Sequence, residues 1–137
     1  ISRKKTTLLP LALEAIKHAS KIATLGVVTT KTARYSEELL EHLGVMHHFK
    51  VLIGRESVTH PKPHPEPIQK ALLALNADPA NTWMIGDTPM DLICAKEAGV
   101  HGIGVLCGYS TQYDLEQHTN FIVHDALDAV KMVASHS

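Results

Sequence analysis

The chain has 137 residues, of which 45% are hydrophobic and 20% are charged. This length allows one compact domain with a substantial core and is short for two. Because 13 Lys and Arg balance 14 Asp and Glu, the formal net charge is -1, and no broad electrostatic field favours nucleic acid or an anionic membrane as a partner.

The sequence shows no signal for a membrane or for an oxidising compartment. No run approaches the roughly 20 apolar residues needed to span a bilayer, and the first residues lack the apolar region of a secretory signal. The two cysteines, Cys94 and Cys107, lie in apolar stretches without a CxxC pairing, which is typical of reduced, packed thiols. We therefore expect a cytoplasmic protein.

Apolar residues alternate along the chain between helical spacing and short β-branched runs. In chain order the pattern predicts a helix over 8–21, a strand over 23–30, a helix over 35–44, a strand over 49–54, a helix over 66–76, a strand over 82–87, a helix over 91–99, a strand over 101–108, a weak strand over 120–123 and a helix over 125–134. The proline-dense stretch 60–67 is predicted to be an extended loop ahead of its helix. Such alternation predicts an α/β fold, a doubly wound (Rossmann-like) parallel sheet with helices on both faces, in a single domain over 1–137.

Ligands of such sheets bind at the carboxyl ends of the strands, and three polar clusters are predicted to lie there. The first cluster is Thr29, Thr30 and Lys31, the second is Lys62, and the third is Asp87 with Asp91. Each has an ordinary structural interpretation. Lys62 could be a solvated loop residue. The threonines could cap a helix, although Thr32 or Ser36 could do the same. Alternatively, these residues could form a phosphate site, in which a threonine hydroxyl, the backbone amides at a helix start and the Lys62 ammonium converge on one phosphoryl group.

The two aspartates also have two readings. Thr88, Pro89 and Asp91 fit a helix start with a capping box, which alone would explain Asp91. Capping does not explain Asp87, which directly follows Gly86 at a strand end, where a bare charge needs a partner. A hard cation such as Mg²⁺, which takes one or two protein carboxylates, would supply that partner.

Two histidine pairs are not assigned to a metal. His60 and His64 have H-x₃-H spacing, but the intervening prolines forbid the regular helix that would bring both onto one face. His47 and His48 follow a predicted helix end, where cationic side chains are favourable against the helix dipole.

The order of three segments resembles the haloacid dehalogenase (HAD) superfamily, and most closely the hydrolases similar to phosphoglycolate phosphatase. These segments are "VVTTK", then after about thirty residues "HPKPHPEPIQKAL", then "WMIGDTPMDLICAKEAGV". The resemblance runs from about Leu25 into the final helix. It implies a Mg²⁺-dependent phosphomonoester hydrolase that acts on a small phosphorylated metabolite through an aspartyl-phosphate intermediate.

Position by position, the resemblance implies the following roles. Thr29 and Lys62 would be catalytic, because Thr29 would hydrogen-bond the phosphoryl group and Lys62 would neutralise charge on it. Thr30, where these phosphatases often have Asn, would also lie at the phosphate. Asp87 would ligate Mg²⁺, and Asp91 would ligate it or orient it through water.

The N-terminal stretch departs from this family. The family's nucleophile is the first Asp of a DxDGT motif on the sheet's first strand, and the stretch 1–20 contains no Asp. We therefore expect the chain to be the C-terminal portion of a longer phosphatase, inactive in isolation. Two alternatives stay open: a non-catalytic phosphate- or partner-binding module, and a phosphoglucomutase-like phosphotransferase.

The resemblance also places the absent strand at the centre of the sheet, between the strands that end at Thr29 and Asp87. The strand over 49–54 would lie beyond the first of these, and the strand over 101–108 beyond the second. We expect the gap to be filled by a second chain or by a missing N-terminal segment, because direct pairing of Val27 with Ile85 would disrupt the helices packed on both faces.

Overall fold

The computed structural model describes residues 12–106 and 110–136. Its strands are β1 (Leu25–Val28), β2 (Phe49–Ile53), β3 (Trp83–Gly86), β4 (His101–Val105) and β5 (Ile122–Val123). Its α-helices are α2 (Ala12–Ser20), α3 (Ala33–His42), α4 (Glu66–Leu75), α5 (Pro89–Ala98), α6 (Gln112–Glu116) and α7 (Ala126–Ser135). Three 3₁₀ turns, Met46–His48, Arg55–Ser57 and Pro79–Asn81, connect them. Each predicted strand and helix has a counterpart among the described residues, although 8–11 of the first predicted helix and 107–108 of the fourth predicted strand lie outside them. Within the described ranges, the short α6 and the 3₁₀ turns were not predicted.

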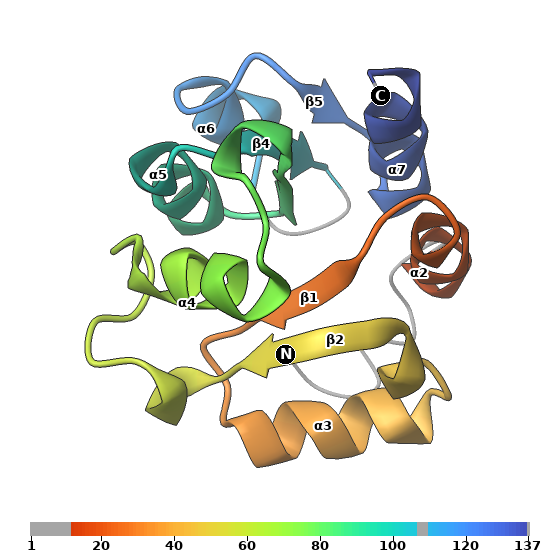
Figure 1. The fold of residues 1–137 in the computed structure, drawn as a ribbon. Coiled ribbons are helices and arrows are strands. Elements are labelled where there is room, and N and C mark those ends of the chain that lie inside the picture. Colours follow the sequence, from red (N-terminus) through yellow and green to blue (C-terminus); the bar gives the residue numbers. More distant parts are fainter. Residues whose placement is uncertain (1–11, 107–109, 137) are drawn as a thin grey trace.

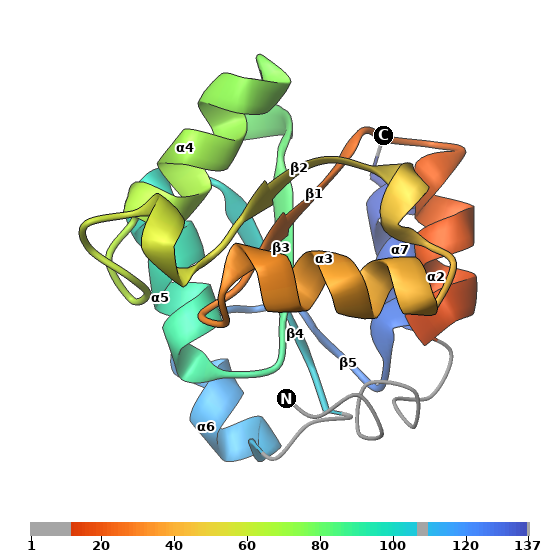
Figure 2. The ribbon, with the colours of Figure 1, turned by 90° about the horizontal axis from the view of Figure 1, so that it is seen from below.

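The strands form two separate parallel sheets, as Figures 1 and 2 show. One pairs β1 with β2, and Val27 lies opposite Leu52. The other has the order β3-β4-β5, and Ile85 lies opposite Ile103. Within the described residues β1 and β3 are not hydrogen-bonded to each other, so Val27 and Ile85 do not pair. The predicted neighbours of β1 and β3 are confirmed, and so is the expectation that the sheet does not close directly.

An apolar cavity of about 390 Å³ lies between the facing edges of β1 and β3. Leu25 to Val28 line it from one side and Trp83 to Ile85 from the other, with α2 and α4 contributing further walls. A second cavity of about 380 Å³ shares Leu25 and Trp83 and continues toward the amino ends of both strands. As a result, the apolar residues of β1 and β3 are only half-buried, although strands in the middle of an α/β domain are normally covered on all sides.

Helices cover both faces of this arrangement (Figure 1). The α4 helix packs on β1 and β2, and α5 beside it packs on β3 and β4, while α7 lies against the other face of β3, β4 and β5. The core on the α4 and α5 face is formed by Ile68, Leu72, Cys94, Ala95 and Val100. The core under α7 is formed by Ile103, Val105 and Ala129. The predicted doubly wound α/β fold is therefore present.

Local sequence explains where the two helices nearest the strand ends begin and stop. The α5 helix starts with Thr88 as its N-cap and Pro89 in its first turn, and it ends at Gly99, whose φ of 77° suits glycine. The α4 helix ends similarly at Asn76, which adopts a left-handed φ of 51°. No helix in the described ranges is long and apolar enough to cross a bilayer.

Candidate functional site

The predicted site residues follow the strands at their carboxyl ends. Thr29 comes directly after β1, and Asp87 comes directly after β3. Lys62 lies in the loop between β2 and α4, and Asp91 lies in the first turn of α5. The cavity between the sheets reaches Val28 and Ile85, so it opens toward the positions of Thr29 and Asp87.

A buried ion pair joins two of these residues across the fold. The Nζ atom of Lys62 lies 2.5 Å from Oδ1 of Asp91, and the two side chains are only 9% and 10% exposed. A buried charge is costly unless it is paired, so neither group would be stable here without the other. Lys62 is therefore not the solvated loop residue of the alternative interpretation, and its ammonium is directed toward the start of α5.

Asp91 is held in place by helix capping. Its Oδ2 accepts hydrogen bonds from the backbone N–H and the hydroxyl of Thr88, at 3.3 and 3.0 Å, and its own N–H donates to the Thr88 hydroxyl. The capping box expected from the sequence is thus present. Since both carboxylate oxygens already have partners, Asp91 could ligate a cation directly only by releasing Lys62 or Thr88.

Gly86 makes room for this carboxylate, a role that sequence reasoning missed. A Cβ atom at Gly86 would lie 2.6 Å from Oδ2 and 2.7 Å from Cγ of Asp91. Any larger residue there would push Asp91 and the first turn of α5 away. The signal was available in the order Gly86-Asp87 at a strand end, but the packing partner could not be read from it.

Asp87 differs from Asp91 in that its carboxylate has no hydrogen-bond or ion-pair partner in the described part of the chain, although the residue is only half-exposed. A partly buried, unpaired carboxylate at the edge of a sheet is suited to bind a hard cation. Among the described residues, Asp87 is thus a carboxylate that could hold a cation such as Mg²⁺ without giving up another partner.

The two threonines after β1 do not cap α3. Thr32 does so, by accepting a hydrogen bond from the N–H of Tyr35. Thr29 is anchored by its N–H, which donates to the carbonyl of Ile53, while its Oγ1 accepts from the N–H of Lys31. The hydroxyl proton of Thr29 is therefore available to a ligand, and Thr30 is exposed beside it. Among the described residues no hydrogen bond or ion pair joins Thr29 or Asp87 to Lys62 or Asp91.

Cys94 is fully buried and unpaired in the core beside this site, as the sequence predicted. Its Sγ atom lies 3.1 Å from the carbonyl oxygen of His64, to which the thiol donates, and burial raises the pKa of the thiol. It therefore helps to fix the loop that carries Lys62. Cys107 lies outside the described residues.

The loop over 60–65 is a tight turn rather than the predicted extended segment. The N–H of His64 donates to the carbonyl of Pro61 at 3.0 Å, and the Lys62–Pro63 peptide bond is cis. Prolines favour turns as well as extended chain, and the spacing alone did not distinguish them. The turn brings the rings of His60 and His64 to a centroid distance of 4.6 Å. The prolines do exclude a helix over this stretch, but the two histidines meet through the turn, which the sequence analysis did not anticipate.

The sequence profile of the haloacid dehalogenase-like hydrolases matches residues 2–105. The chain belongs to this family. It is 40% identical over 107 residues to the "Probable phosphatase IndB" of Dickeya dadantii, and this alignment covers 78% of the chain and 46% of that relative. It is 39% identical over 93 residues to the phosphoglycolate phosphatase of Neisseria meningitidis serogroup A, and this alignment covers 68% of the chain and 40% of that relative.

The fold agrees with a solved member of the haloacid dehalogenase family. A crystal structure named as a predicted phosphoglycolate phosphatase from Haemophilus somnus 129pt superposes with a TM-score of 0.82 at 26% identity, covering 90% of this chain and 56% of that chain. The chain thus spans about half the length of the relatives that it matches. The relatives therefore contain a further portion that has no counterpart in the described residues.

Proposed function

We propose that this chain is part of a Mg²⁺-dependent phosphomonoester hydrolase that acts on a small phosphorylated metabolite. The observation that carries the proposal is the buried Lys62–Asp91 ion pair, which places an ammonium group at the carboxyl edge of the sheet. A purely structural role would not require a charge there, because a buried ion pair is often no more stabilising than packed apolar side chains. The names of the related phosphatases support the same reaction class.

The chain's own residues can bind and orient a phosphoryl group. The Lys62 ammonium would offset the charge of its oxygens, and the Thr29 hydroxyl, whose proton has no acceptor among the described residues, would donate a hydrogen bond to one of them. Thr30 would add a second contact. Asp91 would position Lys62, because the ion pair between them fixes the direction in which the ammonium group points.

Asp87 would hold Mg²⁺, and Asp91 would ligate or orient the ion through water. When bound, Mg²⁺ would neutralise charge on the phosphoryl oxygens and help to align the group for attack. Since one protein carboxylate with waters and phosphate oxygens is a common coordination for Mg²⁺, the missing second direct ligand does not argue against the site.

The nucleophile of the reaction would come from outside the described residues. We propose that a strand bearing an aspartate enters the cavity between β1 and β3, pairs with both edges, and places its carboxylate between Thr29 and Asp87. That carboxylate would form a bond to phosphorus while the bond from phosphorus to the ester oxygen breaks, and this oxygen would take a proton from water and leave as the alcohol. A second water would then hydrolyse the aspartyl phosphate, which frees the carboxylate and releases inorganic phosphate. The strand would belong to a preceding segment of a longer cytoplasmic protein or, as a second option, to another chain. Neither nucleic acid nor a membrane is proposed as a partner.

Two other functions would leave the same residues in place. A non-catalytic module would bind phosphate through Lys62 and Thr29 without turnover. A phosphotransferase similar to phosphoglucomutases would return the phosphoryl group to a second hydroxyl of the substrate. Release of inorganic phosphate separates the hydrolase from both alternatives, because only the hydrolase produces it at a sustained rate.

The test is phosphate release by the longer protein that contains this chain, with phosphoglycolate, pyrophosphate and p-nitrophenyl phosphate as substrates. We expect Asp87→Asn and Lys62→Ala each to lower kcat by roughly 10²-fold or more, the loss typical of removing one group that stabilises charge in the transition state. Lys96→Ala, which removes an exposed lysine of α5, is the matched control and should leave kcat unchanged. Activity at the wild-type level in both Asp87→Asn and Lys62→Ala would refute the proposal.

A further inference from the structure

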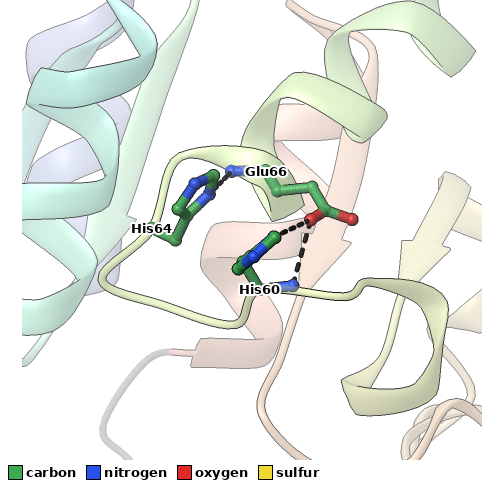
Figure 3. A group of neighbouring side chains, drawn as sticks. All are labelled: His60, His64 and Glu66. Carbon is green, nitrogen blue, oxygen red and sulfur yellow. Dashed lines mark hydrogen bonds and ion pairs between the residues drawn. The ribbon is translucent and has the colours of Figure 1, made fainter.

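Three side chains with metal-binding atoms gather on the loop that precedes α4. They are His60, His64 and Glu66, and one potential ligand atom of each lies within 4.8 Å of the others. Figure 3 shows the two imidazoles one above the other, with the carboxylate of Glu66 beside them. Their ring planes are nearly parallel, with an interplanar angle of 24°. This cluster is separate from Asp87, and the proposed phosphatase chemistry makes no use of it.

Hydrogen bonds of the loop hold the cluster together. The two oxygens of Glu66 accept from the N–H groups of Thr59 and His60, at 2.9 and 3.0 Å. The turn closed by Pro61 and His64 brings the second imidazole back over the first, and Nδ1 of His64 accepts from the N–H of Glu66 at 3.0 Å (Figure 3). The three groups are therefore positioned by the backbone and not by chance side-chain contact.

The ligand atoms of His60 and Glu66 already face each other. The Nδ1 atom of His60 lies 3.1 Å from Oε1 of Glu66, close to the roughly 3.3 Å between two ligand atoms of one tetrahedral ion. A cation bound by this nitrogen and this oxygen would replace the hydrogen bond between them.

We propose that His60, His64 and Glu66 bind a divalent transition cation of the Zn²⁺ class. Two imidazoles and one carboxylate form a ligand set that favours such ions over Mg²⁺, which prefers oxygen ligands only. The imidazoles are exposed, and the His60 side chain is 62% exposed, so a cation can reach the site from solvent. Water would complete the coordination.

Binding requires a small local rearrangement. Ligand atoms at about 2.0–2.1 Å from a tetrahedral ion lie roughly 3.3 Å apart, so atoms now within 4.8 Å of one another must close by no more than about 1.5 Å. The stacked rings must turn so that their lone pairs converge. His60 and Glu66 must exchange the hydrogen bond between them for the cation, and His64 must either release the N–H of Glu66 or bind through its other nitrogen. We therefore expect weaker binding than in a preformed four-ligand zinc site.

The position of the cluster connects it to the candidate active site. Lys62 lies between the two histidines in the sequence, and its ammonium bonds to Asp91 on the far side of the turn. A cation that joins His60 to His64 would close the turn from which Lys62 projects. Binding would then restrict Lys62 without contacting it.

The test is calorimetric titration of the untagged chain with ZnCl₂. We expect saturable binding at this site, and His64→Ala and Glu66→Gln should each weaken it by at least about tenfold, because removing a supporting residue of a metal site alone typically costs 10- to 100-fold. His48→Ala is the matched control, since His47 and His48 also form a close ring pair, at 4.0 Å, but no carboxylate among the described residues completes a cluster with them. Asp87→Asn should leave Zn²⁺ binding unchanged.

Other results would overturn the proposal. Wild-type Zn²⁺ affinity in His64→Ala, or loss of binding in His48→Ala alone, would place the ion elsewhere, and absence of saturable heat would exclude the site. Circular dichroism of each variant before titration separates loss of a ligand from loss of the fold. Because Asp87→Asn removes the proposed Mg²⁺ ligand, loss of Zn²⁺ binding in this variant would place the ion at Asp87 and overturn the cluster, whereas the phosphatase proposal is tested separately by phosphate release.

Discussion

Replacing Gly86 by alanine should destabilise the chain far more than a single methyl group normally does. The added Cβ would lie 2.6 Å from Oδ2 and 2.7 Å from Cγ of Asp91, whereas carbon contacts are ordinarily about 3.5–4.0 Å. The atoms that must give way belong to a residue fixed in the first turn of α5, so the helix start has to move by about 1 Å.

The magnitude combines two effects. Overpacking a tight site costs about 1–3 kcal/mol, and this site belongs at the upper end because the obstructing group cannot rotate away without losing its Thr88 hydrogen bonds. A shift of Asp91 also strains the buried pair with Lys62. We therefore expect a loss of at least about 3 kcal/mol in the free energy of unfolding.

The assay is urea unfolding monitored by circular dichroism, with Gly102→Ala as the matched control. A Cβ at Gly102 would lie 3.2 Å from Cδ2 of Leu92, the end of a flexible side chain that can move by a few tenths of an ångström. The control should therefore change the free energy of unfolding by less than about 1 kcal/mol. Equal losses in the two variants, or a loss below about 1 kcal/mol in Gly86→Ala, would refute the packing argument.

Three further outcomes are expected. Lys62→Met should lower the free energy of unfolding by about 3 kcal/mol in a urea titration, because it leaves the Asp91 carboxylate buried without its cation. The control Arg34→Met, which breaks an exposed ion pair with Glu38, should cost less than about 1 kcal/mol. Similar costs in the two variants would contradict the difference in burial. The pKa of Glu66 is lowered from 4.5 to about 2 in the folded chain, so its contribution to stability is fully present above pH 4.5 and is lost as the pH falls through 2. The free energy of unfolding of Glu66→Gln should therefore fall less steeply over this pH range in an acid titration. A slope equal to that of the unmodified chain would be inconsistent with the hydrogen bonds described. Mg²⁺ should bind this chain only weakly, since Asp87 has no second free carboxylate beside it among the described residues. A sub-micromolar dissociation constant measured by calorimetry would show that the ligand set is more complete than the structure indicates.

The fold was largely predictable because its signals are local and periodic. The run Thr88-Pro89-Met90-Asp91 predicted a capped helix start, and the structure has that capping box. The short apolar runs between helical segments predicted the strands, because they are too short to form helices of ordinary length. The division into two sheets could not come from these patterns; it followed from the family resemblance, which left the position between β1 and β3 without a strand.

The candidate site was less predictable because its contacts join distant segments. The pairing of Lys62 with Asp91 depends on how the loop before α4 packs on α5, and the sequence positions alone are compatible with a solvated lysine. The meeting of His60 and His64 was missed because a turn and an extended segment share the same prolines. The need for a glycine at Gly86 likewise depends on a neighbour that is known only from the packing.

The most direct test of the central claim is the turnover of p-nitrophenyl phosphate by residues 1–137 alone and by the longer protein, each measured with Mg²⁺. If this chain provides the threonine, lysine and metal-binding aspartates of a phosphatase whose nucleophile lies on the strand between β1 and β3, the chain alone should have no appreciable activity. The longer protein should then turn over the substrate and lose that activity in Asp87→Asn. Turnover by residues 1–137 that Asp87→Asn abolishes would contradict the account, because the nucleophile would then lie within the chain itself.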